Sequence, residues 1–164
     1  MDKTLEDLAR QLGEKLQAKG LTLVTAESCT GGWIAKCVTD VAGSSGWLDR
    51  GYVTYSNESK EDMLGVDPDT LEEQGAVSEQ TVLEMAEGAM SSSPAEVAVA
   101  VSGIAGPDGG TPDKPVGTVW FAWTIQGGAE VTRCERFDGD REAVRRQTVA
   151  RALSGTIELL DGDG

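Results

Sequence analysis

Short apolar runs alternate with helix-like segments along the first two thirds of the chain, and this alternation constrains the fold most. Residues 4–19 place leucines at steps of three and four, and residues 21–27, 51–56 and 96–106 are strand-like. Later, residues 117–125 and 129–137 are strand-like runs separated by the glycine-rich turn of a hairpin. Alternation favours parallel strands between helices, and a hairpin adds antiparallel ones. We therefore expect a single-domain, three-layer α/β/α sandwich with a mixed β-sheet.

The ends of the expected helices carry capping signals. Thr4 with Asp7 resembles a capping box, Gly20 is a typical C-terminal stop, and Ser78 is a typical N-cap. Further helical segments are expected over residues 30–41, 57–65, 67–75, 78–91 and 138–160. We assign residues 1–160 to the domain and residues 161–164 to a polar, frayed tail.

The chain is strongly acidic. Its 164 residues include 28 acidic and 14 basic side chains and no histidine, which gives a net charge of −14. Nucleic-acid binding requires a basic surface, so we expect no nucleic-acid partner. No apolar run reaches membrane-spanning length and the N-terminus does not resemble a signal peptide, so we expect a cytoplasmic protein without a membrane partner. The acidity is consistent with adaptation to high salt. Four tryptophans in so acidic a chain favour a homo-oligomer.

The cysteines do not form a metal-binding or disulfide pattern. Cys29, Cys37 and Cys134 are widely spaced, no CxxC pair occurs, and histidine is absent. A zinc site or a disulfide framework is therefore not expected.

The stretch TAESCTGG, residues 25–32, lies between an expected strand and an expected helix. Ser28 and Cys29 are possible nucleophiles there, and Gly31 and Gly32 allow close approach to the backbone. A helix beginning near Thr30 would direct free amide groups towards an anion. Ordinary N-capping by Ser28 or Thr30 explains the same residues equally well.

In a chain without histidine, a lysine can take the proton of a nucleophilic serine if its pKa is lowered. Lys60 follows a strand in the stretch TYSNESK, residues 54–60. The stretch also contains Tyr55, which could orient the lysine or stack on a flat substrate. A solvated lysine on an acidic surface is the alternative.

Two further stretches are suited to binding an anion. Residues 101–118 form a glycine-rich loop whose amides could bind a phosphate or an oxyanion. Arg141 and Arg145 lie four residues apart near the start of the last helix, where cations oppose the helix dipole unless an anion is present. Pairing with the many acidic residues would explain these arginines equally well.

Together, TAESCTGG, GYVTYSNESKEDMLGV, AVSGIAGPDGGTPDKPVGTVW and GDREAVRRQTVARAL resemble, in this order, the sequence blocks of the CinA C-terminal domain family. The resemblance covers nearly the whole chain. It implies hydrolysis of nicotinamide mononucleotide (NMN) to nicotinate mononucleotide and ammonia by a serine–lysine mechanism, without a metal or other cofactor. The loop position Ser102 is often threonine in the family.

The resemblance places Ser28 as nucleophile and Lys60 as general base, and we add Tyr55 to the catalytic set. Backbone amides of residues 30–32 or 103–106 would bind the oxyanion, and Arg141 or Arg145 the phosphate. The expected substrate-binding residues are Thr30, Gly31, Gly32, Asn57, Gly103, Ile104, Ala105, Gly106, Arg141 and Arg145.

Two alternatives remain open at the level of sequence. Cys29 could be the nucleophile in place of Ser28, in an arrangement with Glu27 and Lys60, because a thiol at a helix N-terminus can have a lowered pKa. A non-catalytic nucleotide-binding or regulatory module would also explain the glycine loops and arginines, but it would leave Ser28 and Lys60 without a role.

Overall fold

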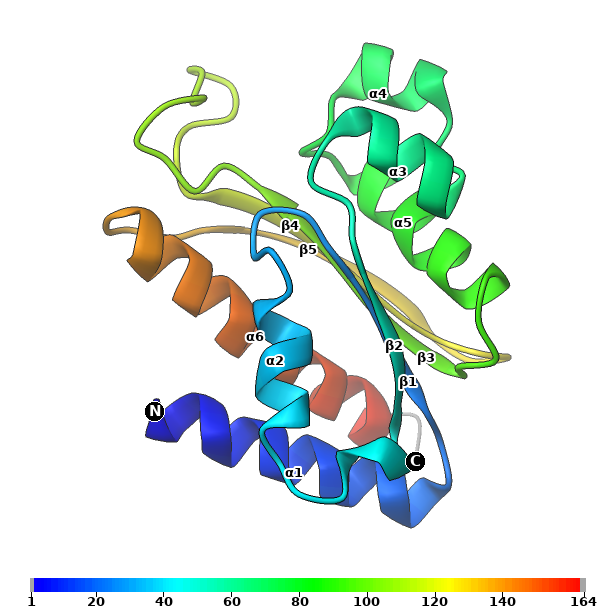
Figure 1. The fold of residues 1–164 in the computed structure, drawn as a ribbon. Coiled ribbons are helices and arrows are strands. Elements are labelled where there is room, and N and C mark those ends of the chain that lie inside the picture. Colours follow the sequence, from blue (N-terminus) through cyan, green and yellow to red (C-terminus); the bar gives the residue numbers. More distant parts are fainter. Residues whose placement is uncertain (1, 163–164) are drawn as a thin grey trace.

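The computed structural model describes residues 2–162, which form one five-stranded mixed sheet between two layers of helices (Figure 1). Its spatial order is β2-β1-β3-β4-β5. Strand β1 runs parallel to its neighbours β2 and β3, while β4 is antiparallel to both β3 and β5, and β3 is the central strand. The strands are β1 Leu23–Glu27, β2 Leu48–Val53, β3 Val97–Gly103, β4 Thr118–Ile125 and β5 Glu130–Arg136.

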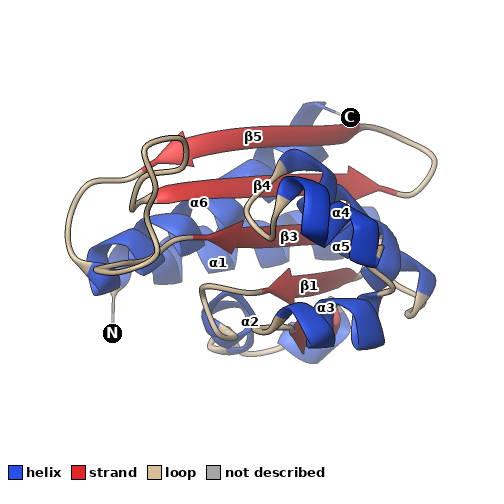
Figure 2. Cartoon of the chain, turned by 90° about the horizontal axis from the view of Figure 1, so that it is seen from above, coloured by secondary structure: helices blue, strands red, loops and turns tan. Residues whose placement is uncertain are grey.

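Three helices cover each face of the sheet, as Figures 1 and 2 show from two directions. One layer consists of α1 (Lys3–Lys19), α2 (Trp33–Thr39) and α6 (Arg141–Gly162). The other consists of α3 (Asn57–Leu64), α4 (Pro68–Gln74) and α5 (Glu79–Ser91). The expected three-layer α/β/α sandwich with a mixed sheet is confirmed.

Strand β3 illustrates why the sheet is buried on both faces. Val97, Val99 and Val101 belong to the core beneath α1 and α6, whereas Ala98 and Ala100 belong to the core beneath α5. Bulky residues therefore alternate with small ones, and both kinds are apolar, as expected for a strand covered on each side.

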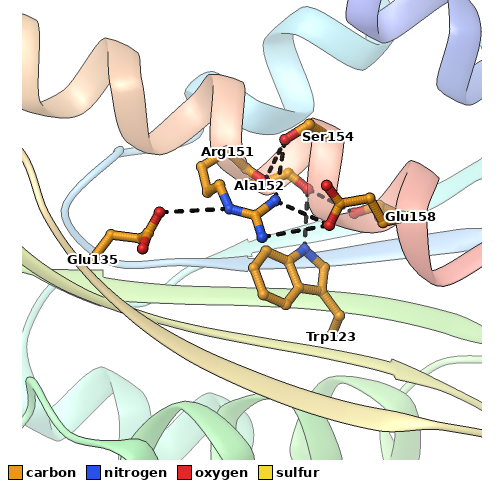
Figure 3. A network of polar contacts seen from close by, with 7 residues as sticks. Trp123, Glu135, Arg151, Ala152, Ser154 and Glu158 are labelled. Carbon is orange, nitrogen blue, oxygen red and sulfur yellow. Dashed lines mark hydrogen bonds and ion pairs between the residues drawn. The ribbon is translucent and has the colours of Figure 1, made fainter.

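Helix α6 is held against β4 by a cluster around Trp123 (Figure 3). The indole Nε1 donates to the carbonyl of Ala152 at 3.1 Å, and the Arg151 guanidinium lies 5.1 Å from the indole centroid. At Gly155, a β-carbon would lie 2.2 Å from the indole ring, so only glycine permits this close packing. Trp47 is buried like Trp123, so these two tryptophans do not provide a surface for subunit contacts.

The predicted capping box at the first helix is wrong, although the stop at Gly20 is confirmed by its left-handed φ of 67°. Asp2 is the N-cap instead, and its carboxylate accepts hydrogen bonds from the amides of Thr4 and Leu5. Arg146 of α6 also binds this carboxylate. A tertiary ion pair therefore helps to place Asp2 at the cap.

Other helix ends also differ from the prediction. Helix α2 begins at Trp33 and not near residue 30, because Gly31 and Gly32 adopt positive φ values of 62° and 102°. Helix α6 begins at Arg141 and continues through Gly162, so residues 161–162 are helical and not a frayed tail. Residues 163 and 164 lie outside the described part of the chain. None of the helices in residues 2–162 has the length and apolar character needed to span a membrane.

Candidate active site

The polar ends of β1, β2 and β3 meet at one edge of the sheet because these strands are parallel. A cavity of about 230 Å³ lies at this edge. It is lined by Ser28, Cys29, Tyr55, Lys60, Ala76, Val77, Ser102, Gly103, Ala105 and Arg141. The fold thus brings residues of all four predicted stretches together, with Arg141 contributed by the last.

Ser28 and Lys60 are in direct contact within this cavity. The Lys60 Nζ lies 2.9 Å from the Ser28 Oγ and donates to the carbonyls of Thr54 and Tyr55 at 2.8 and 3.1 Å. Ser28 follows β1 directly, and Lys60 extends from α3, whose N-terminus is capped by the Ser56 hydroxyl. The lysine is therefore held by two carbonyls in a defined position beside the serine.

The environment of Lys60 favours its neutral form. The side chain is only 1% exposed, and burial lowers the pKa of its amine to about 8. Within residues 2–162, no carboxylate forms an ion pair with it. When the amine is neutral, its two hydrogens can remain on the carbonyls of Thr54 and Tyr55. Its lone pair is then directed at the Ser28 hydroxyl, as a general base requires.

Cys29 lines the same cavity, but its thiol is poorly suited to ionise. Burial, together with the smaller effect of the Glu27 charge, raises the pKa of this thiol to about 12. The lowering expected at a helix N-terminus does not occur because α2 begins four residues later and Glu27 accepts hydrogen bonds from its first-turn amides. This environment favours Ser28 over Cys29 as the nucleophile.

Two amides next to Ser28 are available to bind an anion. The Ser28 amide donates to the carbonyl of Val101 at 3.1 Å, and the Gly31 amide donates to the carbonyl of Ser28 at 3.2 Å. In contrast, the amides of Cys29 and Thr30 donate to no backbone carbonyl among residues 2–162. In the other loop considered, the Ile104 amide donates to the carbonyl of Thr118, whereas the amides of Ala105 and Gly106 also donate to no backbone carbonyl among residues 2–162. Free amides therefore lie both in the turn that carries Ser28 and in the loop after β3.

Tyr55 and Arg141 form the outer wall of the cavity. The Tyr55 side chain is 63% exposed, and its hydroxyl accepts a hydrogen bond from Arg141 at 3.2 Å. Arg141 also donates to the carbonyl of Gly106 at 2.8 Å. Tyr55 contacts Lys60 through its backbone carbonyl and not through its ring. An exposed aromatic ring and a cation therefore stand together at the entrance.

Several predicted binding residues do not line this cavity. Arg145 donates to the carbonyls of Cys29 and Thr30 at 3.0 and 3.1 Å and borders a neighbouring hollow with Gly31 and Gly32. The Thr30 side chain is buried and donates to Glu27.

The remaining three predicted residues, Asn57, Ile104 and Gly106, also lie outside the lining of the cavity. Asn57 is exposed at the start of α3, and neither Asn57 nor Ile104 is among the lining residues. Gly106 contributes its carbonyl to Arg141.

Sequence reasoning missed the inner wall of the cavity. Ala76 and Val77 come from the turn between α4 and α5, and their residue types carry no chemical signal. The lysine-binding carbonyls of Thr54 and Tyr55 belong to the backbone and have no signature in the sequence. Ser102 was noted only as a departure from the family pattern, although its position after the β3 valines indicated a site near the strand end.

A serine–lysine pair in a cavity at the carboxyl edge of an α/β/α sandwich defines a class of possible hydrolases. The model of the CinA C-terminal domain matches residues 5–160, and the chain belongs to this family. It is 59% identical over 152 residues to the nicotinamide-nucleotide amidohydrolase PncC of Escherichia coli (strain K12), covering 93% of this chain and 92% of that protein. A protein of the same name from Pseudomonas putida is 55% identical, with 93% and 94% covered.

Solved structures agree with this assignment. The competence/damage inducible protein CihA from Agrobacterium tumefaciens matches with a TM-score of 0.93 at 49% identity, covering 95% of each chain. A competence-damaged protein (CinA) superfamily protein from Klebsiella pneumoniae matches with a TM-score of 0.92 at 42% identity, covering 96% of this chain and 98% of that one. The resemblance predicted from the four sequence blocks is confirmed.

Proposed function

We propose that this protein is a nicotinamide-nucleotide amidohydrolase that converts NMN and water to nicotinate mononucleotide and ammonia. The observation that carries the proposal is the 2.9 Å contact between the Nζ of buried Lys60 and the Oγ of Ser28 inside a cavity. The choice of substrate follows the name of the PncC relatives, nicotinamide-nucleotide amidohydrolase, which are 55–59% identical to this chain.

In the first half-reaction, Ser28 Oγ attacks the carboxamide carbon while neutral Lys60 takes the hydroxyl proton. The amides of Cys29 and Thr30 stabilise the resulting oxyanion, and one such donor typically contributes roughly 3 kcal/mol. Lys60 then returns the proton to the nitrogen as the carbon–nitrogen bond breaks. Ammonia leaves, and the nicotinoyl group remains as an ester on Ser28.

In the second half-reaction, a water molecule replaces ammonia. Lys60 takes a proton from the water as its oxygen attacks the ester carbon, and the same two amides hold the second oxyanion. The carbon–Ser28 bond breaks and Lys60 protonates Ser28 Oγ. The product is released as the carboxylic acid, which gives its proton to ammonia or to solvent and becomes the nicotinate carboxylate. Ser28 and Lys60 are then back in their starting states. The chain's own side chains perform each proton transfer, and we propose no metal or cofactor.

The walls of the cavity suit the parts of NMN. The pyridinium ring is flat and positively charged, so it can pack against the exposed Tyr55 ring, with Ala76 and Val77 on the inner side. Arg141 is the better candidate for the phosphate, because it lines the cavity that holds Ser28 and Lys60, whereas Arg145 borders the neighbouring hollow. The glycine-rich backbone at Gly103 and Ala105 completes the contact surface.

We also propose a cytoplasmic location, where NMN would be recycled into NAD synthesis, and a homo-oligomeric state. Val53 and Met63 are exposed large apolar side chains ten residues apart in the sequence and are available for subunit contacts. Light scattering during size-exclusion chromatography tests the oligomer, and a monomer mass would reject it.

The experiment that tests the function measures ammonia release from NMN by the wild type and by Lys60→Ala. Release by the wild type that disappears in a folded variant supports the amidohydrolase. If calorimetry detects NMN binding to a wild type that never releases ammonia, the non-catalytic nucleotide-binding module replaces it.

A further inference from the structure

Glu27 is a buried carboxylate for which the proposed reaction has no use. It is the last residue of β1, its exposed fraction is 0%, and it forms no ion pair within residues 2–162. Its Oε1 accepts from the Thr30 hydroxyl at 2.5 Å and the Ile34 amide at 2.9 Å, and its Oε2 accepts from the Ala35 amide at 3.0 Å. Burying a carboxylate costs free energy even when hydrogen-bond donors partly offset the lost hydration. We therefore expect Glu27 to have a specific role.

The Glu27 side chain connects the end of β1 to the start of α2. Helix α2 has seven residues, too few to be stable alone, and its first amides need acceptors from outside the helix. The carboxylate supplies them and places a negative charge at the positive end of the helix. Both ends of the segment between Ser28 and Gly32 are thereby held in place.

The Glu27 backbone is linked to the other half of the serine–lysine pair. Its carbonyl accepts a hydrogen bond from the Thr54 amide at 2.9 Å, and the Thr54 carbonyl in turn accepts from Lys60 at 2.8 Å. Glu27 is thus bonded to the turn that carries Ser28 and to the segment that holds Lys60.

From these contacts we infer that Glu27 is a positioning residue, which sets the Ser28–Lys60 contact and the direction of the free amides of Cys29 and Thr30. The inference rests on the proposed function. Glu27 does not line the cavity, and its carboxylate faces α2, so it transfers no proton to or from substrate.

The test is Glu27→Gln, which keeps the side-chain shape but places an NH₂ group where one oxygen accepts an amide. The matched control is Glu96→Gln. The Glu96 carboxylate accepts hydrogen bonds from the Thr22 amide and hydroxyl at 3.0 and 2.8 Å. These two residues immediately precede β3 and β1, at the end of the strands opposite to the cavity. We expect Glu27→Gln to lower kcat for NMN by about 10- to 100-fold while KM stays within about threefold, since small misplacements of reacting groups have effects of this size. Glu96→Gln should change neither by more than about twofold.

Two further readouts separate positioning from folding and from proton transfer. The midpoint of the pH–kcat profile should be the same in Glu27→Gln and the wild type, because Lys60 remains the base. Thr30→Val removes one donor to Glu27 and should lower kcat, whereas Thr30→Ser keeps the hydroxyl and should restore it. Thermal unfolding must show that every variant is folded at the assay temperature.

Wild-type kcat in folded Glu27→Gln would overturn the inference, and so would a shifted pH midpoint, which would place Glu27 in proton transfer. Labelling of Ser28 by diisopropyl fluorophosphate separates this inference from the proposed substrate. If the wild type is labelled but releases no ammonia from NMN, the proposed function fails, and slower labelling of Glu27→Gln still supports positioning. Equal labelling rates in the wild type and Glu27→Gln, or no labelling of the wild type, would overturn the inference that Glu27 is a positioning residue.

Discussion

Lys114 donates a 2.6 Å hydrogen bond to the carbonyl of Gln74, which ties the glycine-rich loop to the turn after α4. The two residues that follow Gly75 in this turn, Ala76 and Val77, line the inner wall of the cavity. A contact made by the glycine-rich loop therefore supports the surface against which the substrate ring would pack.

We expect Lys114→Ala to raise KM for NMN by about three- to tenfold with little change in kcat, because it loosens a binding wall and leaves Ser28 and Lys60 in place. Steady-state kinetics measure this, with Lys19→Ala as a control at an exposed lysine at the end of α1. A fall in kcat at constant KM would show that the loop acts on the chemical step.

Substitution separates the two candidate nucleophiles. Ser28→Ala should lower kcat by roughly 10³-fold or more, as removal of a nucleophile does in serine hydrolases. Cys29→Ala should retain activity within about fivefold, since its thiol has a raised pKa and only its amide serves the oxyanion. Ammonia release from NMN measures both. The reverse pattern would assign the nucleophile to Cys29.

The pH dependence of kcat/KM should follow the ionisation of Lys60. Because the amine must be neutral to accept a proton and its pKa is about 8, activity should rise with pH and level off above about 8. A profile governed by a group that titrates below pH 6 would contradict the assignment. Rates are measured at constant ionic strength between pH 6 and 10.

The same ionisation affects stability with a definite sign. The pKa of Lys60 is lowered from 10.5 to about 8 in the folded state, so the unfolded chain binds more protons between these values. The free energy of unfolding therefore rises with pH across this window, by at most about 3 kcal/mol from this group. Lys60→Met should lack this rise. Urea unfolding at pH 7.5 and 10 compares the two proteins, and parallel changes would contradict the prediction.

Salt should stabilise the layer formed by α3, α4 and α5. Lys60 is the only basic residue between Arg50 and Lys114, and its side chain is buried. The acidic residues of this layer are Glu58, Glu61, Asp62, Asp67, Asp69, Glu72, Glu73, Glu79, Glu84 and Glu87. Added salt screens their repulsion. We expect the unfolding temperature to rise between 0.05 and about 1 M KCl, and a constant value would reject high-salt adaptation.

The elements of the fold were predictable where one pattern decided the outcome. The alternating apolar runs predicted the strands, although the second one lies at Leu48–Val53 and not at residues 51–56. Ser78 and Gly20 marked helix ends correctly. The cap of α1 was not predictable, because Asp2 is held by Arg146 from the other end of the chain. The start of α2 was misplaced because two glycines in the left-handed region delay the helix.

The site residues, too, were predictable where a local sequence pattern identified them and not where contacts between distant segments decide their role. The resemblance indicated Ser28 and Lys60, and the fold brings them into contact. Arg141 and Arg145 share a helix face and were equivalent in the sequence, yet the carbonyls of Cys29 and Thr30 bind only Arg145. Such backbone contacts depend on how distant segments meet, and residue types alone do not indicate them.

The isolation of Lys60 from carboxylates has a consequence for how the reaction responds to heat. Ionisation of an amine absorbs much more heat than ionisation of a carboxylic acid, so the proton affinity of a lone lysine falls as temperature rises. The active fraction at neutral pH should therefore increase on warming, in addition to the usual acceleration of the chemical step. The working pH range of this protein would then depend on the temperature of its surroundings, extending towards lower pH in warm conditions and contracting in cold ones.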